Sequence, residues 1–95
     1  MEIGEFQRHI VEIFGEKDRA RGLERSFLWF VEEVGELAEA VRRGSPAERS
    51  HEVGDCLAWL CSVADQLGVD MADAAARFAG GCPRCGGTPC ACIED

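Results

Sequence analysis

The sequence predicts an all-α protein, and three observations support that fold class. Apolar residues recur at three- and four-residue spacing through most of the first 80 residues, which is the period of an amphipathic helix. Residues that typically start and end helices stand between these segments. No segment shows the period-two alternation of a strand with one exposed face. We therefore expect an antiparallel helical hairpin with flanking helices.

The first two helices are expected on either side of a charged stretch. Residues 3–15 carry apolar side chains at helical spacing, whereas residues 16–22 are mostly charged and predict fraying and a turn. A second helix should run from about Glu24 to Arg43, with Gly44 just beyond its end. Its predicted core stripe consists of Phe27, Phe30, Val31, Val34, Leu37, Ala38 and Val41.

The third and fourth helices have clearer boundaries. In residues 45–48, serine can cap the helix, proline suits its first position and glutamate its third. This third helix should reach about Leu67, where Gly68 ends it. Asp70 can cap a short fourth helix over about 71–79. The predicted core stripe of the third helix consists of Val53, Leu57, Leu60, Ala64 and Leu67.

Length, charge and composition narrow the class of protein. A chain of 95 residues makes one small domain with a marginal core, so self-association is expected. The net charge of −8 disfavours general binding to nucleic-acid backbones. No run of about 18 apolar residues predicts a membrane span, and no secretory signal is visible, so we expect a cytoplasmic protein. We divide the chain into a helical domain, residues 1–80, and a Cys-rich tail, residues 81–95.

Two acidic patterns on the predicted hairpin indicate a metal site. They are Glu32-Glu33-x-x-Glu36 on one helix and Glu52-x-x-Asp55 on the next. Residues three or four apart share a helix face, so antiparallel helices can bring these carboxylates together. Such a cluster repels itself unless protons or cations neutralise it, and all-oxygen ligands suit Mg²⁺ or Mn²⁺. The pattern favours a metal-dependent enzyme that acts on phosphates over a merely solvated acidic face.

One tryptophan accompanies each acidic pattern. Trp29 precedes its acids in sequence and Trp59 follows its own, so antiparallel helices place both indoles at the same end of the cluster. They could stack a nucleotide base or pack in a core or subunit interface. Gln7 on the first helix is a further candidate for a base pocket.

Residues 28–40, LWFVEEVGELAEA, and residues 52–60, EVGDCLAWL, resemble the MazG-like nucleotide pyrophosphohydrolases of the all-α NTP pyrophosphatase superfamily. The resemblance covers about residues 3–80. It implies a helical bundle completed as a homodimer or homotetramer. It also implies Mg²⁺-dependent hydrolysis of nucleoside triphosphates to monophosphate and pyrophosphate, in the house-cleaning of nucleotide pools.

The same resemblance assigns roles to individual residues. It makes Glu33, Glu36, Glu52 and Asp55 the metal ligands. Glu32 matches an additional family glutamate that would orient or deprotonate the attacking water. Arg77 stands where relatives often have lysine near the end of the last helix, which suggests contact with phosphate.

Two alternative interpretations are also consistent with the sequence. The chain could act on dUTP, dCTP or phosphoribosyl-ATP as a relative in the same superfamily. It could also be a non-catalytic helical interaction module whose acids are surface charge and whose tail binds a partner.

The tail carries four closely spaced cysteines. Cys82, Cys85, Cys90 and Cys92 follow the pattern C-x₂-C, four residues, C-x-C, and four such thiolates can enclose one structural Zn²⁺. Residues 82–86 resemble half of a zinc knuckle. Free thiols, redox chemistry and disulfides are the alternatives.

Overall fold

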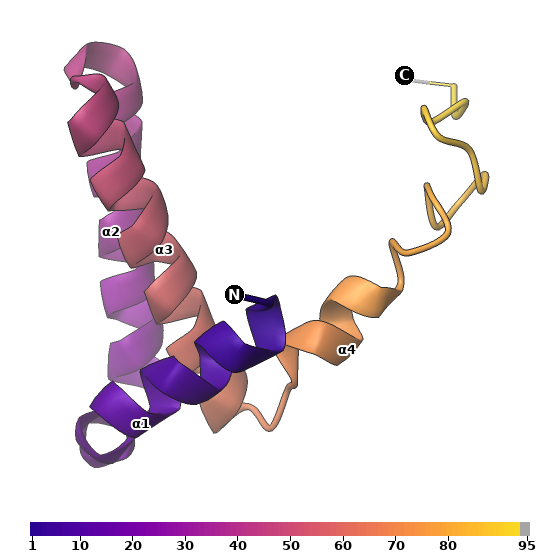
Figure 1. The fold of residues 1–95 in the computed structure, drawn as a ribbon. Coiled ribbons are helices and arrows are strands. Elements are labelled where there is room, and N and C mark those ends of the chain that lie inside the picture. Colours follow the sequence, from indigo (N-terminus) through magenta and orange to yellow (C-terminus); the bar gives the residue numbers. More distant parts are fainter. Residues whose placement is uncertain (94–95) are drawn as a thin grey trace.

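The structure, a computed structural model, describes residues 1–93, and every regular element within them is a helix (Figure 1). In chain order the helices are α1 (Ile3–Arg21), α2 (Leu23–Arg43), α3 (Pro46–Gln66) and α4 (Met71–Ala76). The predicted all-α class is therefore confirmed. The last two residues of the predicted tail, Glu94 and Asp95, lie outside the described residues.

Helices α2 and α3 form the predicted antiparallel hairpin, and polar caps fix the turn between them (Figure 1). The Ser45 hydroxyl accepts from the Glu48 N–H at 3.2 Å, and the Glu48 carboxylate accepts from the Ser45 N–H at 3.1 Å. This capping box was expected from the sequence. The Arg49 guanidinium donates to the carbonyls of Ala40 (2.9 Å) and Val41 (3.3 Å), so the carbonyl end of α2 is satisfied by the start of α3.

Helix α1 is longer than the sequence predicted. We expected fraying from residue 16, but the helix continues to Arg21 and turns at Gly22, whose φ is +93°. The reason is tertiary: the Asp18 side chain is buried and lies 2.6 Å from the Arg21 guanidinium. That guanidinium in turn lies 4.9 Å from the centre of the Trp59 ring on α3. The charged residues therefore continue the packed face of α1 instead of ending it.

Helix α4 starts as predicted and ends early. The Asp70 carboxylate accepts from the N–H groups of Ala72 (2.8 Å) and Asp73 (3.4 Å), which confirms the cap. Regular helix stops at Ala76, and the predicted extension to about residue 79 is a set of tighter turns closed by hydrogen bonds three residues apart. Helix α4 packs against α1 and leads into the tail (Figure 1).

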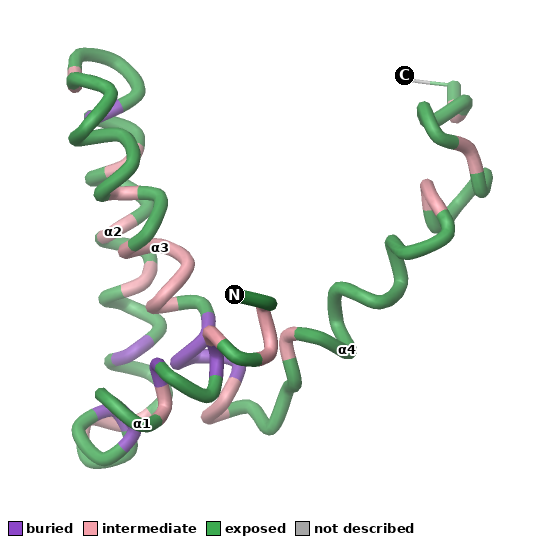
Figure 2. Tube along the Cα trace, in the orientation of Figure 1, coloured by how far each residue is buried: buried purple, intermediate pink, exposed green. Residues whose placement is uncertain are grey.

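The buried core is small, and most of it lies where α1 crosses the hairpin, whereas Ala40 is buried at the other end, near the turn into α3 (Figure 2). Cys61 is fully buried, whereas Cys56 is half-buried. The Gln66 amide donates to the buried Ser26 hydroxyl at 2.8 Å, which ties α3 to α2 at this end of the hairpin. The apolar core residues are Ile10, Ala40, Cys61, Val63 and Ala64.

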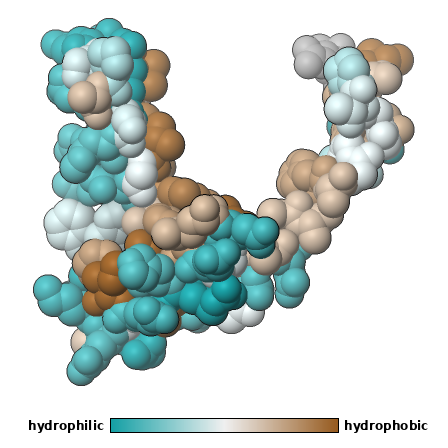
Figure 3. All heavy atoms as spheres, in the orientation of Figure 1, coloured by the Kyte–Doolittle hydropathy of each residue, from teal (hydrophilic) through white to brown (hydrophobic). Residues whose placement is uncertain are grey.

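Most of the predicted core stripe of the hairpin is exposed in a single chain. We call these residues the hairpin face; they are Phe27, Val31, Val34, Val41, Val53, Leu60 and Leu67. Figure 3 shows apolar surface along the edge of the hairpin that faces α4 and the tail, and hydrophilic surface along the opposite edge. The chain exposes 7025 Å², against about 5,400 Å² for a compact protein of 10.4 kDa. The expectation of a buried stripe is wrong for an isolated chain because one helix, α1, covers only one end of the hairpin.

The helices were also compared with the demands of a bilayer. Among the described residues, no helix combines the length and the apolar character that crossing a membrane requires.

Candidate functional site

The four acids predicted as ligands face one another across the hairpin. Glu33 and Glu36 come from α2, and Glu52 and Asp55 come from α3. Burial raises the pKa of the Glu33 carboxyl, and the negative charges of Asp55, Glu52 and Glu36 raise it further. These three acids are therefore close enough to Glu33 to disfavour its charged form. The antiparallel geometry therefore places Glu33 near the acids of α3. Glu52 and Asp55, together with His51, form the group whose ligand atoms lie within 4.8 Å of one another. Glu33 and Glu36 are not part of that group.

One oxygen of this cluster has no hydrogen-bond partner. It is Oε2 of Glu52, which is buried; no other side-chain oxygen or nitrogen among the described residues shares both properties. Leaving a buried carboxylate oxygen unpaired is costly unless a proton or cation meets it. Glu52 and Glu36 also line the same open pocket, of about 330 Å³. The donor set is all oxygen and carries excess negative charge, so it fits a hard divalent cation.

Two neighbours of the cluster were given no role from the sequence. His51 Nε2 lies 3.2 Å from Asp55 Oδ2, and His51, Glu52 and Asp55 each offer a ligand atom within 4.8 Å of one another. The i, i+4 spacing of His51 and Asp55 was the available signal for this contact. Burial raises the pKa of the Cys56 thiol, and the charges of Glu33, Glu52 and Asp55 add to that shift. The thiol therefore stays neutral beside the cluster.

Glu32 lies on the outer edge of the site. It directly precedes Glu33 on α2 and is exposed to solvent. Its carboxylate lies about one helical turn from Glu36.

The two predicted tryptophans stack on each other at the hairpin. The ring centroids of Trp29 and Trp59 are 6.2 Å apart, and their planes differ by 15°. Both lie on the same side of the acids, as the opposite order of tryptophan and acids in the two helices required. Trp29 remains 46% exposed, so a flat ligand can reach its indole.

A pocket of about 220 Å³ opens beside Trp59 and Asp55, and α1 supplies half of its wall. Lys17, Asp18 and Arg21 line it, together with the hairpin residues. These three residues were not predicted as site residues because they fall in the charged stretch expected to form a turn. Their spacing from Phe14, which continues the face of the first helix, was the signal that could have revealed them.

Gln7 and Arg77 lie elsewhere in the chain. The Gln7 amide donates to the Val69 carbonyl at 2.9 Å and accepts from the Met71 N–H at 2.9 Å, which fastens the α3–α4 loop to α1. These contacts are structural and give the base-pocket prediction for Gln7 no support. Arg77 ends α4, where its guanidinium lies 5.0 Å from the Phe78 ring centre.

The family model of the MazG nucleotide pyrophosphohydrolase domain matches residues 21–80. The chain belongs to this family. The matched region of the MazG domain contains α2, α3 and all four acids of the cluster. It excludes most of α1, which lines the pocket, and the cysteines of the tail. A search of curated proteins found no match to the chain.

Proposed function

We propose that this MazG-family chain is a Mg²⁺-dependent nucleoside triphosphate pyrophosphohydrolase that releases nucleoside monophosphate and pyrophosphate. Mn²⁺ would serve in place of Mg²⁺. The observation that carries the proposal is the unpartnered Glu52 oxygen inside a cluster of acids that lies within the matched family region. House-cleaning of noncanonical or excess nucleotides in the cytoplasm is the role we assign to this activity.

Glu33, Glu36, Glu52 and Asp55 would hold the metal. The cation that they hold would attract the triphosphate, which the negatively charged chain would otherwise repel. When bound, Mg²⁺ neutralises phosphate oxygens and lowers the pKa of coordinated water.

The remaining residues can orient the substrate and move a proton. Water attacks the α-phosphorus, a new P–O bond forms, and the bond to the β-phosphate breaks, so that pyrophosphate leaves. We assign Glu32 as the base that accepts the proton of the attacking water, because it is exposed and beside the cluster. Lys17 and Arg21 supply positive charge in the pocket beside Asp55. The face of Trp29, or a gap opened between Trp29 and Trp59, would stack the base.

A second copy of the chain would cover the hairpin face. The surface in excess of a compact monomer is about 1,600 Å². A standard protein interface buries about 800 Å² on each partner, so one such interface in a homodimer would cover about half of this excess, and two in a homotetramer would cover about all of it. Such an assembly also offers a way to bring Arg77 of one copy to the site of another, which a single chain does not.

Product analysis tests the proposed reaction. The protein is incubated with a panel of nucleoside triphosphates and Mg²⁺, and the products are separated. Monophosphate and pyrophosphate in equal amounts are expected, whereas stepwise release of orthophosphate would contradict the reaction. Glu36→Gln should lower the rate by roughly 10²–10³-fold, the usual effect of losing one electrostatic contact to a transition state. Glu16→Gln, which changes an exposed acid on α1, is the matched control.

A further inference from the structure

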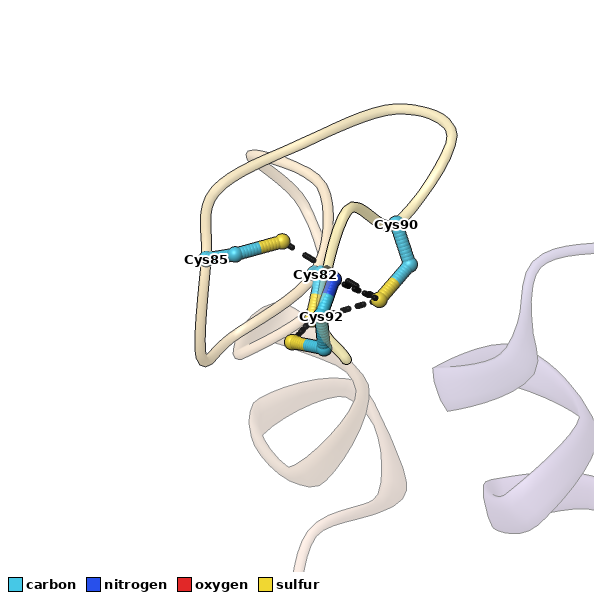
Figure 4. Close-up of side chains that lie close together, drawn as sticks. All are labelled: Cys82, Cys85, Cys90 and Cys92. Carbon is cyan, nitrogen blue, oxygen red and sulfur yellow. Dashed lines mark hydrogen bonds between the residues drawn. The ribbon is translucent and has the colours of Figure 1, made fainter. Parts of the chain in front are cut away.

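The four cysteines of the tail form a compact cluster (Figure 4), and they share no residue with the acidic site. The Sγ atoms of Cys82, Cys85, Cys90 and Cys92 all lie within 4.8 Å of one another. The separation is 3.6 Å between Cys82 and Cys90, 3.7 Å between Cys82 and Cys92, and 4.0 Å between Cys85 and Cys90. Two segments of chain, each with a pair of cysteines, therefore point four sulfurs at one centre.

These separations match a metal site and not disulfides. A Zn–S bond is about 2.3 Å, so the sulfurs of a tetrahedral Zn(Cys)₄ site lie about 3.8 Å apart. A disulfide needs a sulfur–sulfur distance of about 2.05 Å, and all four cysteines are free in the structure. The tight C-x-C pair therefore contributes both of its sulfurs to the cluster.

The backbone holds the sulfurs in place. The Gly86 N–H donates to the Cys82 carbonyl at 2.7 Å, and the Cys82 N–H donates to the Gly87 carbonyl at 3.0 Å, which closes a turn around the first pair. N–H groups of Gly87 and Ala91 point at the Cys85 sulfur, at 3.4 and 3.3 Å. Donors aimed at a sulfur stabilise a thiolate, the form that binds metal.

Glycine is required where this turn meets the end of the helical domain. Gly81 has φ +108°, and a Cβ there would lie 2.7 Å from the Thr88 hydroxyl oxygen and 2.8 Å from the Gly86 carbonyl oxygen. The chain approaches itself too closely for any side chain at this position. The tail is therefore a specifically folded loop, even though residues 82–93 contain no helix or strand.

We propose that Cys82, Cys85, Cys90 and Cys92 bind one Zn²⁺ as four thiolates, in a structural site separate from the acidic cluster. Four protein ligands leave no position open for water, so this metal takes no part in hydrolysis. Its role is to fold the tail, since none of the side chains in residues 81–93 is buried. Soft thiolates prefer zinc to Mg²⁺, whereas carboxylates prefer Mg²⁺, so we expect the cysteine cluster to bind zinc and the acidic cluster to bind Mg²⁺.

Metal analysis of the purified full-length protein tests the proposal. The protein is kept reduced, dialysed against buffer with Mg²⁺, and analysed for zinc and iron by mass spectrometry. One zinc per chain is expected. Cys85→Ser and Cys90→Ser should each lower the zinc content at least tenfold, while helix content by circular dichroism stays unchanged. Cys56→Ser, a cysteine on α3 outside the cluster, should keep the zinc.

The controls separate this site from the acidic one. Glu36→Gln should retain a full zinc, and Co²⁺ in place of zinc should give the visible spectrum of tetrahedral thiolate coordination. The proposal is overturned if the protein holds less than a tenth of a zinc per chain, if iron occupies the site, or if Glu36→Gln removes the zinc while Cys85→Ser keeps it. Because none of these readouts depends on hydrolysis, failure of the proposed activity leaves the zinc test intact.

Discussion

Glu52→Gln should have opposite effects on stability with and without Mg²⁺. Glu52 stands among three other acids, Glu33, Glu36 and Asp55, and one of its oxygens is buried without a partner. In the metal-free protein the negative charge of Glu52 therefore destabilises the folded state. Glutamine keeps the size of the side chain and removes that charge.

The magnitude follows from the number of neighbours. Like-charged pairs on helix surfaces cost about 0.2–0.5 kcal/mol each, so relief from three acids stabilises the metal-free variant by about 0.6–1.5 kcal/mol. With Mg²⁺ at 100 times its Kd, the wild-type protein gains about 2.7 kcal/mol. If the variant binds Mg²⁺ about 100-fold more weakly, its gain falls to about 0.4 kcal/mol. The order of stability should therefore reverse.

Thermal unfolding at one protein concentration, with chelator and with Mg²⁺, measures both effects. A fixed concentration is needed because self-association also stabilises the folded state. Glu16→Gln should follow the wild-type protein in both conditions. A Glu52→Gln protein that is much less stable than wild type in chelator would refute the view of these acids as a strained, cation-seeking cluster.

Three further changes test other parts of the structure. Asp18→Asn leaves the Arg21 guanidinium without its buried carboxylate, so urea unfolding should show a loss of about 2–3 kcal/mol, and an unchanged midpoint would contradict the pairing. Val34→Asp puts a charge on the hairpin face, so light scattering should report a smaller species than for wild type; equal masses would count against an interface there. In metal-free protein the pKa of Glu33 is raised above its usual 4.5, so the folded state binds a proton at Glu33 more tightly than the unfolded state does. The stability that this protonation contributes is lost as pH rises through the raised pKa. Glu33→Gln should flatten this fall, and parallel pH profiles would argue against the shift; Glu48, whose pKa is lowered by its Ser45 hydrogen bonds, contributes equally to both proteins.

Local chemistry made the hairpin predictable. The capping residues Ser45 and Glu48 act within four residues of one another, so the sequence contains all the information that starts α3. The convergence of the acids follows from helical spacing and an antiparallel turn, both of which are visible in the sequence.

The missed features depend on contacts between distant residues. Asp18 and Arg21 look like solvent-exposed charges until α3 supplies Trp59 and the carboxylate is buried. The sequence does not indicate that the backbone of the α3–α4 loop will hydrogen-bond to both the nitrogen and the oxygen of the Gln7 side-chain amide. The hairpin face was predicted to be buried because its apolar residues have the spacing of a helical core stripe. The sequence alone does not reveal that a single chain has too few helices to cover this face.

The central claim is that Glu33, Glu36, Glu52 and Asp55 jointly bind a divalent cation. Anomalous diffraction from crystals soaked in Mn²⁺ with a non-hydrolysable nucleotide tests it most directly. We predict a manganese peak between α2 and α3 within bonding distance of carboxylate oxygens from both helices, next to the phosphates. A bound nucleotide with no manganese peak between these helices, or with the peak at a different group of residues, would contradict the account.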